Sequence, residues 1–281
     1  MRQENVGADR LEELRRYLAE RIPAGICLAL SGGVDSALLL ALLAPFARQQ
    51  PDRVLAVTFA SNFQPGTDVA LAGRLAAGCR VRHRILTVDG FADPELRRNP
   101  PDRCYRCKKQ LFEALRKLAD EAELQHLLDG TNFDDLQQYR PGRRALQELA
   151  VLSPLAELGI AKNEIRSLAE RLEIPVAQRP AAPCLATRFP YGAELTPAGF
   201  QLVEAGEEAI RRRGFRIVRI RLHGEVARIE IDEPELPEFW RQRREIAGEL
   251  KRLGFRYLAL DLEGFRSGSM DLSLKTGQTI I

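Results

Sequence analysis

Two serines and an aspartate with a spacing suited to phosphate chemistry stand early in the chain, where residues 31–36 read Ser-Gly-Gly-Val-Asp-Ser. They directly follow 26–30, an apolar run without charge that indicates a buried strand of a parallel sheet. The glycines permit a sharp turn, because glycine enters the left-handed region without steric cost. Ser36 is then expected to cap an apolar helix over 37–43, whose free N–H groups and dipole suit a phosphate. The pattern favours a nucleotide-binding loop over an ordinary tight turn.

Three of the five cysteines form a second candidate site. Cys104 and Cys107 make a C-x₂-C pair just ahead of an expected helix, and Cys184 stands alone in a Pro-flanked loop, whereas Cys27 and Cys79 are expected in the core. A thioredoxin-like redox pair would follow the first strand, which this pair does not. A structural zinc site needs four ligands, and the three histidines are scattered. The third interpretation is an iron–sulfur cluster held by three cysteines, with one iron open to another ligand.

Alternating strands and helices are expected to position these residues. Strands are predicted over 26–30, 53–59, 81–88 and 126–130, with helices over 69–78 and 110–122 and an opening amphipathic helix that ends near Pro23. The β-α-β-α-β alternation implies a parallel sheet with right-handed crossovers, an α/β fold. Thr131 and Asn132 follow the fourth strand, at the carboxyl end of the sheet where open α/β folds bind their ligands.

The character of the chain changes near Thr196. The stretch 139–191 is rich in Pro and Gly around one helix at 163–172. Beyond it the pattern predicts a helix over 198–213, a hairpin of 216–222 with 227–231, a helix over 237–253 and a strand over 256–260. We therefore predict two domains: 1–195, with the nucleotide loop and the cysteines, and a smaller α+β domain over 196–281 for substrate binding or oligomerisation.

Composition limits the class of protein. Of 281 residues, 29% are charged and 45% hydrophobic, which is typical of a globular protein. The net charge of +3 is too small to indicate nucleic-acid binding by itself, and no apolar run approaches the ~20 residues that span a bilayer. The N-terminus lacks the apolar core of a signal peptide, so we expect a cytoplasmic location with reduced cysteines.

The loop Ser31-Gly32-Gly33-Val34-Asp35-Ser36 resembles that of the PP-loop ATP pyrophosphatases, which cleave ATP to AMP and pyrophosphate. The resemblance implies a Rossmann-like sheet of the adenine nucleotide alpha hydrolase type, with the hydroxyls of Ser31 and Ser36 at the pyrophosphate and Asp35 as a ligand of Mg²⁺. Further segments are similar to the LarE-type pyridinium-3,5-bisthiocarboxylic acid mononucleotide synthases, namely 99–108, 129–135, 140–145, 151–155, 184–192 and 265–270. Together they cover nearly the whole chain in order.

The family resemblance implies a sulfur transfer that uses ATP. The family adenylates a carboxylate of pyridinium-3,5-biscarboxylic acid mononucleotide with ATP and Mg²⁺, and sulfur then displaces AMP; a second round treats the other carboxylate. Members that carry the C-x₂-C pair are expected to bind a [4Fe-4S] cluster, whose ligands here would be Cys104, Cys107 and Cys184. Members with one cysteine, at the position of Cys184, sacrifice its sulfur and end with dehydroalanine. The three cysteines favour the cluster, with the sacrificial route as the alternative.

Cationic side chains complete the set of candidates. Adenylation gives a carboxylate a good leaving group, and the negative charge that develops calls for nearby cations. Lys108, Arg103 and Arg188 are candidates for that role, and solvated loop charges are the alternative. Arg219 and Arg221 lie two residues apart on a predicted strand and share one of its faces, where they can bind a substrate phosphate; surface solubility is the alternative.

Other functions stay open. A tRNA thiolase joins this type of loop to cysteines, but it would add an RNA-binding module or a basic face. An amidating ligase would leave the three cysteines unexplained, and a sensor of AMP or ATP would need no metal at Asp35. The predicted partners are a small nucleotide substrate and a sulfide donor, without a membrane and with tRNA only in the thiolase interpretation. The family also suggests a homo-oligomer.

Overall fold

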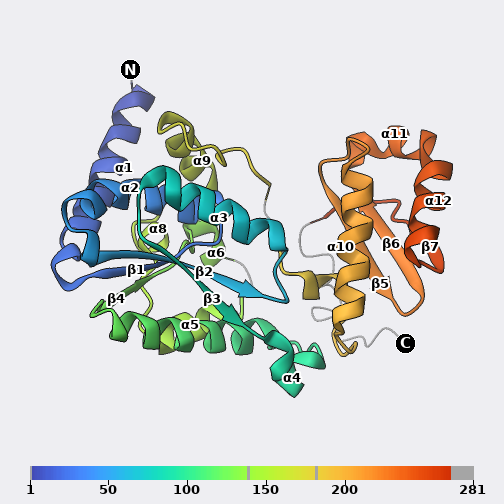
Figure 1. Cartoon of the computed structure of the whole chain (residues 1–281). Coiled ribbons are helices and arrows are strands. Elements are labelled where there is room, and N and C mark those ends of the chain that lie inside the picture. The colour runs from blue at the N-terminus through green and yellow to red at the C-terminus, as the bar shows by residue number, and fades with distance from the viewer. Residues whose placement is uncertain (1, 138–139, 181–182, 267–281) are drawn as a thin grey trace. The chain divides into compact units, whose positions relative to one another are not determined.

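The computed structural model describes residues 2–137, 140–180 and 183–266. These form two compact units (Figure 1). Unit 1 comprises the described residues of 1–61, 66–89 and 104–182, and unit 2 those of 62–65, 90–103 and 183–281. The longest segment of the second unit runs from Pro183, and two short earlier segments belong to the same unit. The roles assigned to the two predicted domains stay predictions.

Unit 1 is built on a sheet of four parallel strands. They are β1 (Ile26–Ala29), β2 (Val54–Ser61), β3 (His83–Val88) and β4 (His126–Leu128). Their order across the sheet is β3-β2-β1-β4. Ile26 of β1 lies beside Val54 of β2 on one side and His126 of β4 on the other, so β1 and β4 run side by side to their carboxyl ends. The predicted α/β fold with a parallel sheet is confirmed.

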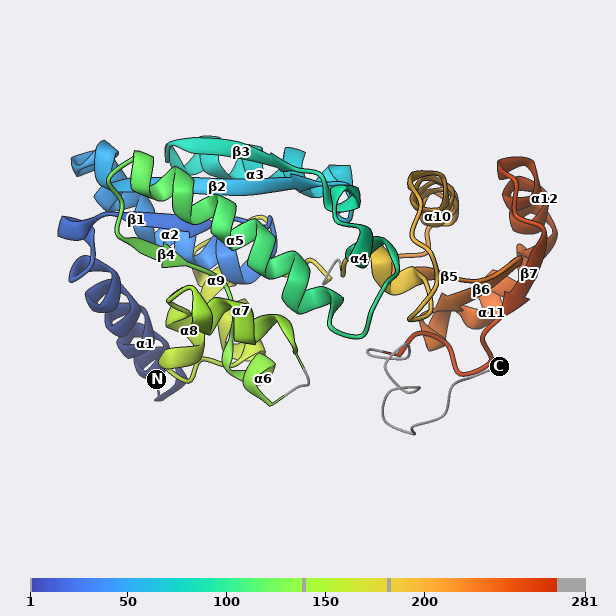
Figure 2. The same ribbon diagram turned by 90° about the horizontal axis from the view of Figure 1, so that it is seen from below.

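Helices cover both faces of this sheet, which explains the continuous apolar run of β1. The helices of unit 1 are α1 (Arg2–Ala19), α2 (Val34–Gln49), α3 (Gly66–Cys79), α5 (Arg103–Glu121), α6 (Phe133–Leu136), α7 (Gly142–Glu148), α8 (Pro154–Glu157) and α9 (Lys162–Arg171). Ile26 and Leu28 pack into one core with α1, α2, α3 and α9, while Cys27 and Leu55 belong to a second core with α5. Figures 1 and 2 show α5 on the face opposite α2 and α3.

The described residues of unit 2 form a three-stranded sheet and four α-helices, together with short 3-10 turns. Its elements are α4 (Pro94–Arg97), α10 (Pro197–Arg211), β5 (Val218–His223), β6 (Val226–Ile231), α11 (Leu236–Arg241), α12 (Arg243–Leu253) and β7 (Tyr257–Leu260). β5 and β6 are antiparallel, and β7 runs parallel to β6. Thr196 caps α10 by accepting a hydrogen bond from the Gly199 N–H. The predicted β-β-α-β pattern is confirmed, except that its helix is interrupted at Gln242.

Two helix starts differ from the predictions in ways that concern the candidate sites. Gly33 is the N-cap of α2, so Ser36 lies in the first turn of the helix rather than at its cap. α5 begins at Arg103 rather than near residue 110, so the C-x₂-C pair lies in its first turns and not ahead of it. Pro100 and Pro101 both lie before this start, where the Arg103 N–H donates to the Pro100 carbonyl at 3.0 Å.

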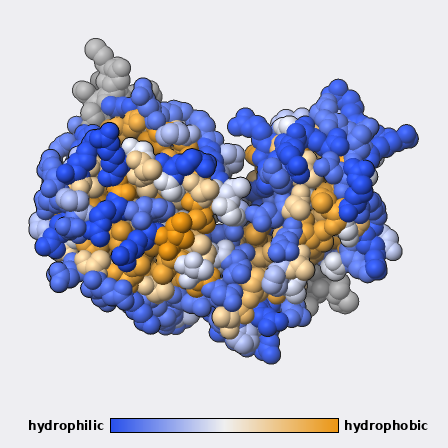
Figure 3. All heavy atoms as spheres, viewed as in Figure 1, coloured by the Kyte–Doolittle hydropathy of each residue, from blue (hydrophilic) through white to orange (hydrophobic). Residues whose placement is uncertain are grey.

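No helix within the described ranges is both long and apolar enough to cross a membrane. On the face drawn in Figure 3, hydrophilic residues cover most of the surface of each unit, with apolar ones showing between them. Such a surface agrees with the ordinary globular composition of the chain.

Candidate functional site

The predicted nucleotide loop brings two hydroxyls and two backbone N–H groups together at the start of α2. The Ser36 hydroxyl donates to the Gly33 carbonyl at 3.1 Å and lies 3.1 Å from the Ser31 hydroxyl. The Gly33 N–H donates to Ser31 Oγ at 3.3 Å, and the Ser31 N–H to Ser36 Oγ at 3.2 Å. Since hydroxyls rotate to suit a new partner, these groups can turn from one another to phosphate oxygens at a helix N-terminus.

Gly32 fastens this loop to α3. Its φ of 77° lies in the left-handed region, and an added Cβ would stand 3.1 Å from the backbone oxygen of Asp68. Arg179 donates to the Gly32 carbonyl at 3.2 Å and also pairs with the Asp68 carboxylate. One guanidinium therefore ties the loop backbone to the first turn of α3, which keeps the loop in a fixed shape before any ligand binds.

Asp35 lies between an amide and an ammonium group. Its Oδ1 accepts from the Asn132 side-chain amide at 3.3 Å, and its Oδ2 pairs with Lys162 Nζ. Asn132 is in turn fixed as the N-cap of α6, where it accepts from the Asp135 N–H at 3.2 Å. A part-exposed carboxylate beside a phosphate-binding loop fits Mg²⁺, which takes one or two carboxylates together with phosphate oxygens. Asp35 is thus suited to the predicted metal role.

Asp129 is the hub of a second polar cluster, at the end of β4. Its nearly buried carboxylate accepts from the Thr131 N–H at 3.1 Å, the Thr131 hydroxyl at 2.5 Å and the Ser153 hydroxyl at 2.6 Å. Lys108 Nζ lies 3.4 Å from the same carboxylate. A carboxylate with four such donors has all its acceptor positions filled, so the role of Asp129 is to hold these side chains in place. The Thr131 hydroxyl was predicted to contact the nucleotide, and here it donates a hydrogen bond to Asp129.

Gly130 brings the two clusters together. An added Cβ at this position would stand 2.9 Å from the Ser36 backbone nitrogen and 3.1 Å from Asp35 Cβ. Only a glycine therefore allows the chain after β4 to run against the first turn of α2. The consequence is that two aspartate–lysine pairs, Asp35 with Lys162 and Asp129 with Lys108, flank one loop at the carboxyl edge of the sheet.

The cysteines divide by exposure and by unit. Cys104 is exposed and Cys107 half-buried at positions i and i+3 of α5 in unit 1, and Cys184 is half-buried in unit 2. Burial raises the pKa of the Cys27 thiol to about 12 and that of Cys79 above its ordinary value, so these two stay protonated at neutral pH. Both fit the predicted role as packing residues.

Within the described ranges, no set of three or more His, Cys, Asp or Glu side chains gathers in a way that could hold a metal ion. The chemistry of the donor set nevertheless suits an iron–sulfur cluster, because Cys104, Cys107 and Cys184 all keep some solvent access and thiolates are its usual ligands. The [4Fe-4S] cluster therefore stays a proposal.

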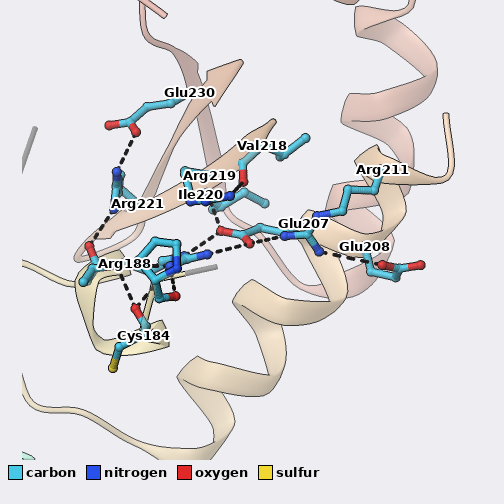
Figure 4. A network of polar contacts seen from close by, with 12 residues as sticks. Cys184, Arg188, Glu207, Glu208, Arg211, Val218, Arg219, Ile220, Arg221 and Glu230 are labelled. Atoms are coloured by element: carbon cyan, nitrogen blue, oxygen red, sulfur yellow. Dashed lines mark hydrogen bonds and ion pairs between the residues drawn. The ribbon is translucent and has the colours of Figure 1, made fainter. Parts of the chain in front are cut away.

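Arg188 is buried at the centre of a polar network in unit 2 (Figure 4). Its Nε and one terminal nitrogen donate to the two carboxylate oxygens of Glu207 at 2.8 and 3.0 Å. The other terminal nitrogen donates to the carbonyls of Pro183 at 2.8 Å and Cys184 at 3.1 Å. The guanidinium thus fastens the loop of Cys184 to α10. Its predicted role at the reacting charge stays a prediction.

The Glu207 carboxylate accepts hydrogen bonds from two further groups. It accepts from Arg211 at 2.6 Å and from the Ile220 N–H of β5 at 3.1 Å. Burial alone would raise its pKa, but the hydrogen bonds and charge of Arg188, with the other arginines, hold the pKa of Glu207 below its ordinary value of 4.5. The carboxylate is therefore ionised and joins the Cys184 loop, α10 and β5.

Arg219 and Arg221 are both buried, which excludes surface solubility as their role. Arg221 donates to the Thr187 carbonyl at 2.9 Å and pairs with Glu230 at 2.8 Å. Burial, with the charge of Arg188 next in weight, lowers the pKa of Arg219 to about 10. Ion pairs join Arg188 and Arg211 to Glu207, Arg211 to Glu208, Arg221 and Arg228 to Glu230, and Arg228 to Asp261. Binding of a substrate phosphate by Arg219 and Arg221 stays a prediction.

Arg103, another predicted cation, also has a structural contact. It donates to the side-chain oxygen of Asn99 at 2.7 Å and its guanidinium carbon lies 4.5 Å from the centre of the Tyr191 ring. Asn99, fully buried with a φ of 50°, donates to the carbonyls of Phe189 and Pro190 at 3.1 and 2.7 Å. The segment just before Cys104 therefore holds the chain that follows Cys184, within unit 2.

Sequence reasoning missed four residues at these sites: Asp129, Lys162, Arg179 and Glu207. A signal existed for Glu207, which is a charge between Val203 and Ile210 on the apolar face of a predicted helix. Asp129 lies near the carboxyl end of the strand predicted over 126–130, at the ligand-binding edge. Lys162 and Arg179 reach the loop from distant parts of the chain, and no local pattern marks them. The segment 267–270 of the family resemblance lies outside the described residues.

The chain is similar to known proteins over most of its length. A family model described as asparagine synthase matches residues 12–136, the part with the loop and the parallel sheet. The chain is 34% identical to pyridinium-3,5-bisthiocarboxylic acid mononucleotide synthase of Lactiplantibacillus plantarum, over 90% of this chain and 91% of that protein. It is 36% identical to an uncharacterized protein of Synechocystis sp., over 93% of this chain and 97% of the relative.

A more distant match covers only part of the chain. The tRNA-specific 2-thiouridylase of Pelobacter propionicus is 28% identical over 55% of this chain and 51% of that enzyme. The shared part of such a partial match is too short to carry the activity of the whole relative. Identity over nine-tenths of both chains and the PP-loop at the carboxyl edge of a parallel sheet point to one group: the chain belongs to the pyridinium-3,5-bisthiocarboxylic acid mononucleotide synthase family of the PP-loop superfamily.

Proposed function

We propose that the chain is an ATP-dependent sulfurtransferase that converts the carboxylates of pyridinium-3,5-biscarboxylic acid mononucleotide to thiocarboxylates, a step of nickel-pincer nucleotide cofactor biosynthesis. The observation that carries the proposal is the Ser31–Ser36 loop at the start of α2, beside the Asp35 carboxylate, in a chain of this family. Family membership supports the coarser statement, an ATP-using enzyme with a sulfur-transfer role. The substrate and the order of steps are the proposed part.

The first half-reaction uses the residues of unit 1. The loop N–H groups and hydroxyls bind the leaving pyrophosphate, and Asp35 would hold Mg²⁺, which when bound would neutralise negative charge on the phosphate oxygens. A substrate carboxylate oxygen attacks the α-phosphorus, the bond to the pyrophosphate oxygen breaks, and an acyl adenylate forms. Lys108, oriented by Asp129, is placed to stabilise negative charge that develops at this edge. The adenylate then has AMP as a good leaving group.

The second half-reaction needs sulfur. We assign Cys104, Cys107 and Cys184 as ligands of a [4Fe-4S] cluster, which when bound would supply sulfide to the adenylate. The alternative is that Cys184 gives up its own sulfur and becomes dehydroalanine. In either case Arg188 supports the reacting group, because its hydrogen bond to the Cys184 carbonyl fixes the backbone that carries the thiol.

Substrate phosphate binding is assigned to Arg219 and Arg221. Both guanidinium groups are buried, and the charge of the nearby Arg188 contributes to the lowered pKa of Arg219, which supports an anionic ligand. Assembly into a homo-oligomer is part of the same proposal, by family resemblance. The rival function, thiolation of tRNA, draws only on the partial match to a 2-thiouridylase.

Pyrophosphate release tests the proposal. Protein purified without oxygen is mixed with ATP, Mg²⁺ and the pyridinium mononucleotide, and pyrophosphate is measured with and without the substrate. We expect release only when substrate is present. Release that depends on tRNA instead would establish the thiolase, and a protein that binds ATP without cleaving it under either condition would be a sensor.

A further inference from the structure

Lys162 makes a contact that the proposed chemistry does not use. Its ammonium is paired with Oδ2 of Asp35, the carboxylate assigned to Mg²⁺. A lysine ammonium and a magnesium ion both seek the same carboxylate oxygen, and both cannot hold it at once. The contact therefore raises the question of where this ammonium goes when the metal and ATP bind.

The two ends of Lys162 differ in how firmly they are held. Lys162 opens α9, and its backbone N–H donates to Oδ2 of Asp134 at 2.8 Å. α9 is in turn anchored by Ile165 and Leu168, which are buried in the core with α2. The side chain is about one-third exposed and ends in a flexible four-carbon stem with a rotatable ammonium group. The backbone of Lys162 is therefore held in place, while rotation about its side-chain bonds can move the ammonium group.

The charge stands in an unfavourable place unless an anion accompanies it. The N-terminus of α2 carries the positive end of the helix dipole, which favours Asp35 in the first turn and disfavours a nearby cation. The polyphosphate of ATP would bring several negative oxygens to this helix start. An ammonium that leaves Asp35 would then find a stronger partner within reach of the same loop.

We propose that Lys162 is a resident counter-ion that occupies the cation position of Asp35 in the empty loop and moves to a phosphate oxygen of ATP when Mg²⁺ takes the carboxylate. Lys162 thereby keeps Asp35 neutralised between turnovers and adds a contact to the triphosphate during them. The inference rests on the proposed function, in that it assumes an ATP and Mg²⁺ site at this loop.

The test measures the two ligands separately, so that activity is not the readout. Mn²⁺ replaces Mg²⁺ as a paramagnetic probe, and its binding to the nucleotide-free protein is followed by electron paramagnetic resonance. ATP binding is followed by calorimetry in the presence of a chelator, without metal. The variants are Lys162→Met, which removes the charge and keeps the length, and Lys162→Arg, which keeps the charge; Lys117→Met, at an exposed position of α5, is the matched control.

We expect Lys162→Met to change the affinities for Mn²⁺ and for ATP in opposite directions. Lys162→Met should bind Mn²⁺ about fivefold more tightly because its competitor is gone, and ATP about tenfold more weakly because a charge-assisted phosphate contact is lost. Lys162→Arg should retain ATP affinity within about threefold, and Lys117→Met should change neither affinity. Thermal melting of each variant checks that the fold is intact.

Two results overturn the inference. If Lys162→Met weakens both ligands or leaves both unchanged, the lysine is a structural contact only, and the counter-ion role is wrong. If Lys162→Arg loses as much ATP affinity as Lys162→Met, the charge is not what binds the phosphate. A wild-type protein that binds neither Mn²⁺ nor ATP would instead contradict the proposed function, which keeps the two failures distinct.

Discussion

The two polar regions of the molecule handle charge in opposite ways. At the PP-loop, Asp35 and Lys162 form a part-exposed pair whose side chains keep 18% and 32% of their accessible surface. In unit 2, Arg188 and Glu207 keep 2% each. A pair that touches water can exchange its partner for a ligand at modest cost, whereas separating a buried pair leaves a charge without compensation. The comparison therefore indicates that the Asp35–Lys162 pair can exchange partners for a ligand, whereas the Arg188–Glu207 pair supports the fold.

Replacing Asp35, the carboxylate of the part-exposed Asp35–Lys162 pair, should have the largest effect on activity. Asp35→Asn keeps the side-chain shape but loses the charge that holds Mg²⁺, and we expect it to abolish pyrophosphate release without lowering the melting temperature of the protein. Ser36→Ala should do the same through the loss of a hydroxyl at the pyrophosphate. Asp52→Asn, a fully exposed carboxylate on a surface pair, is the control and should stay active. Full ATP cleavage by either loop variant would show that the loop is misassigned.

Replacing Glu207, the carboxylate of the buried Arg188–Glu207 pair, should instead destabilise the fold. Glu207→Ala leaves the buried Arg188 without its carboxylate partner and also removes a partner of the part-exposed Arg211, and breaking such a buried pair costs about 3–5 kcal/mol. Chemical denaturation should report this loss as a lower free energy of unfolding. The neighbouring Glu208→Ala, at a mostly exposed position, should change that free energy by less than about 0.5 kcal/mol. Equal stability of the two variants would remove the distinction drawn between the regions.

The same carboxylate predicts how stability depends on pH. Because the pKa of Glu207 is lower in the folded protein than its ordinary 4.5, its contribution is complete above pH 4.5 and is lost as the pH falls towards the folded value. The wild-type protein should therefore lose stability below pH 4.5 more steeply than Glu207→Gln, which has no proton to take up. Unfolding curves at pH 3.5 to 7 measure this, and parallel profiles for the two proteins would contradict it.

The phosphate assignment predicts the smallest effect. Arg221→Ala should raise the KM for the pyridinium substrate about tenfold, the loss of one charge-assisted contact, and change the KM for ATP by much less. Arg256→Ala, an exposed arginine of the same unit, is the control. A similar rise in both constants for Arg221→Ala would mean that the network supports the enzyme in general and has no dedicated phosphate site.

Local patterns carried most of what could be predicted from the sequence. The loop and the strand before it were predictable because a charge-free run and two glycines act within a few residues of one another. The start of α5 was not, since Arg103, Cys104 and Arg106 have no apolar period and the two prolines suggested a loop. Lys162 could not be assigned at all, because it meets Asp35 across 127 positions of sequence. The sequence placed Arg219 and Arg221 on one face of a strand, but it took the structure to show that both side chains are buried and are not surface charges.

The fate of the sulfur tests the central claim most directly. Protein purified without oxygen is incubated with ATP, Mg²⁺, sulfide and pyridinium-3,5-biscarboxylic acid mononucleotide, and the nucleotide product and the protein chain are both analysed by mass spectrometry. We predict a product in which sulfur replaces a carboxylate oxygen, formed together with AMP and pyrophosphate, while Cys184 keeps its mass and Cys104→Ala is inactive. A dehydroalanine at position 184 with Cys104→Ala fully active would establish the sacrificial route. Pyrophosphate release without sulfur in the product would contradict sulfur transfer itself.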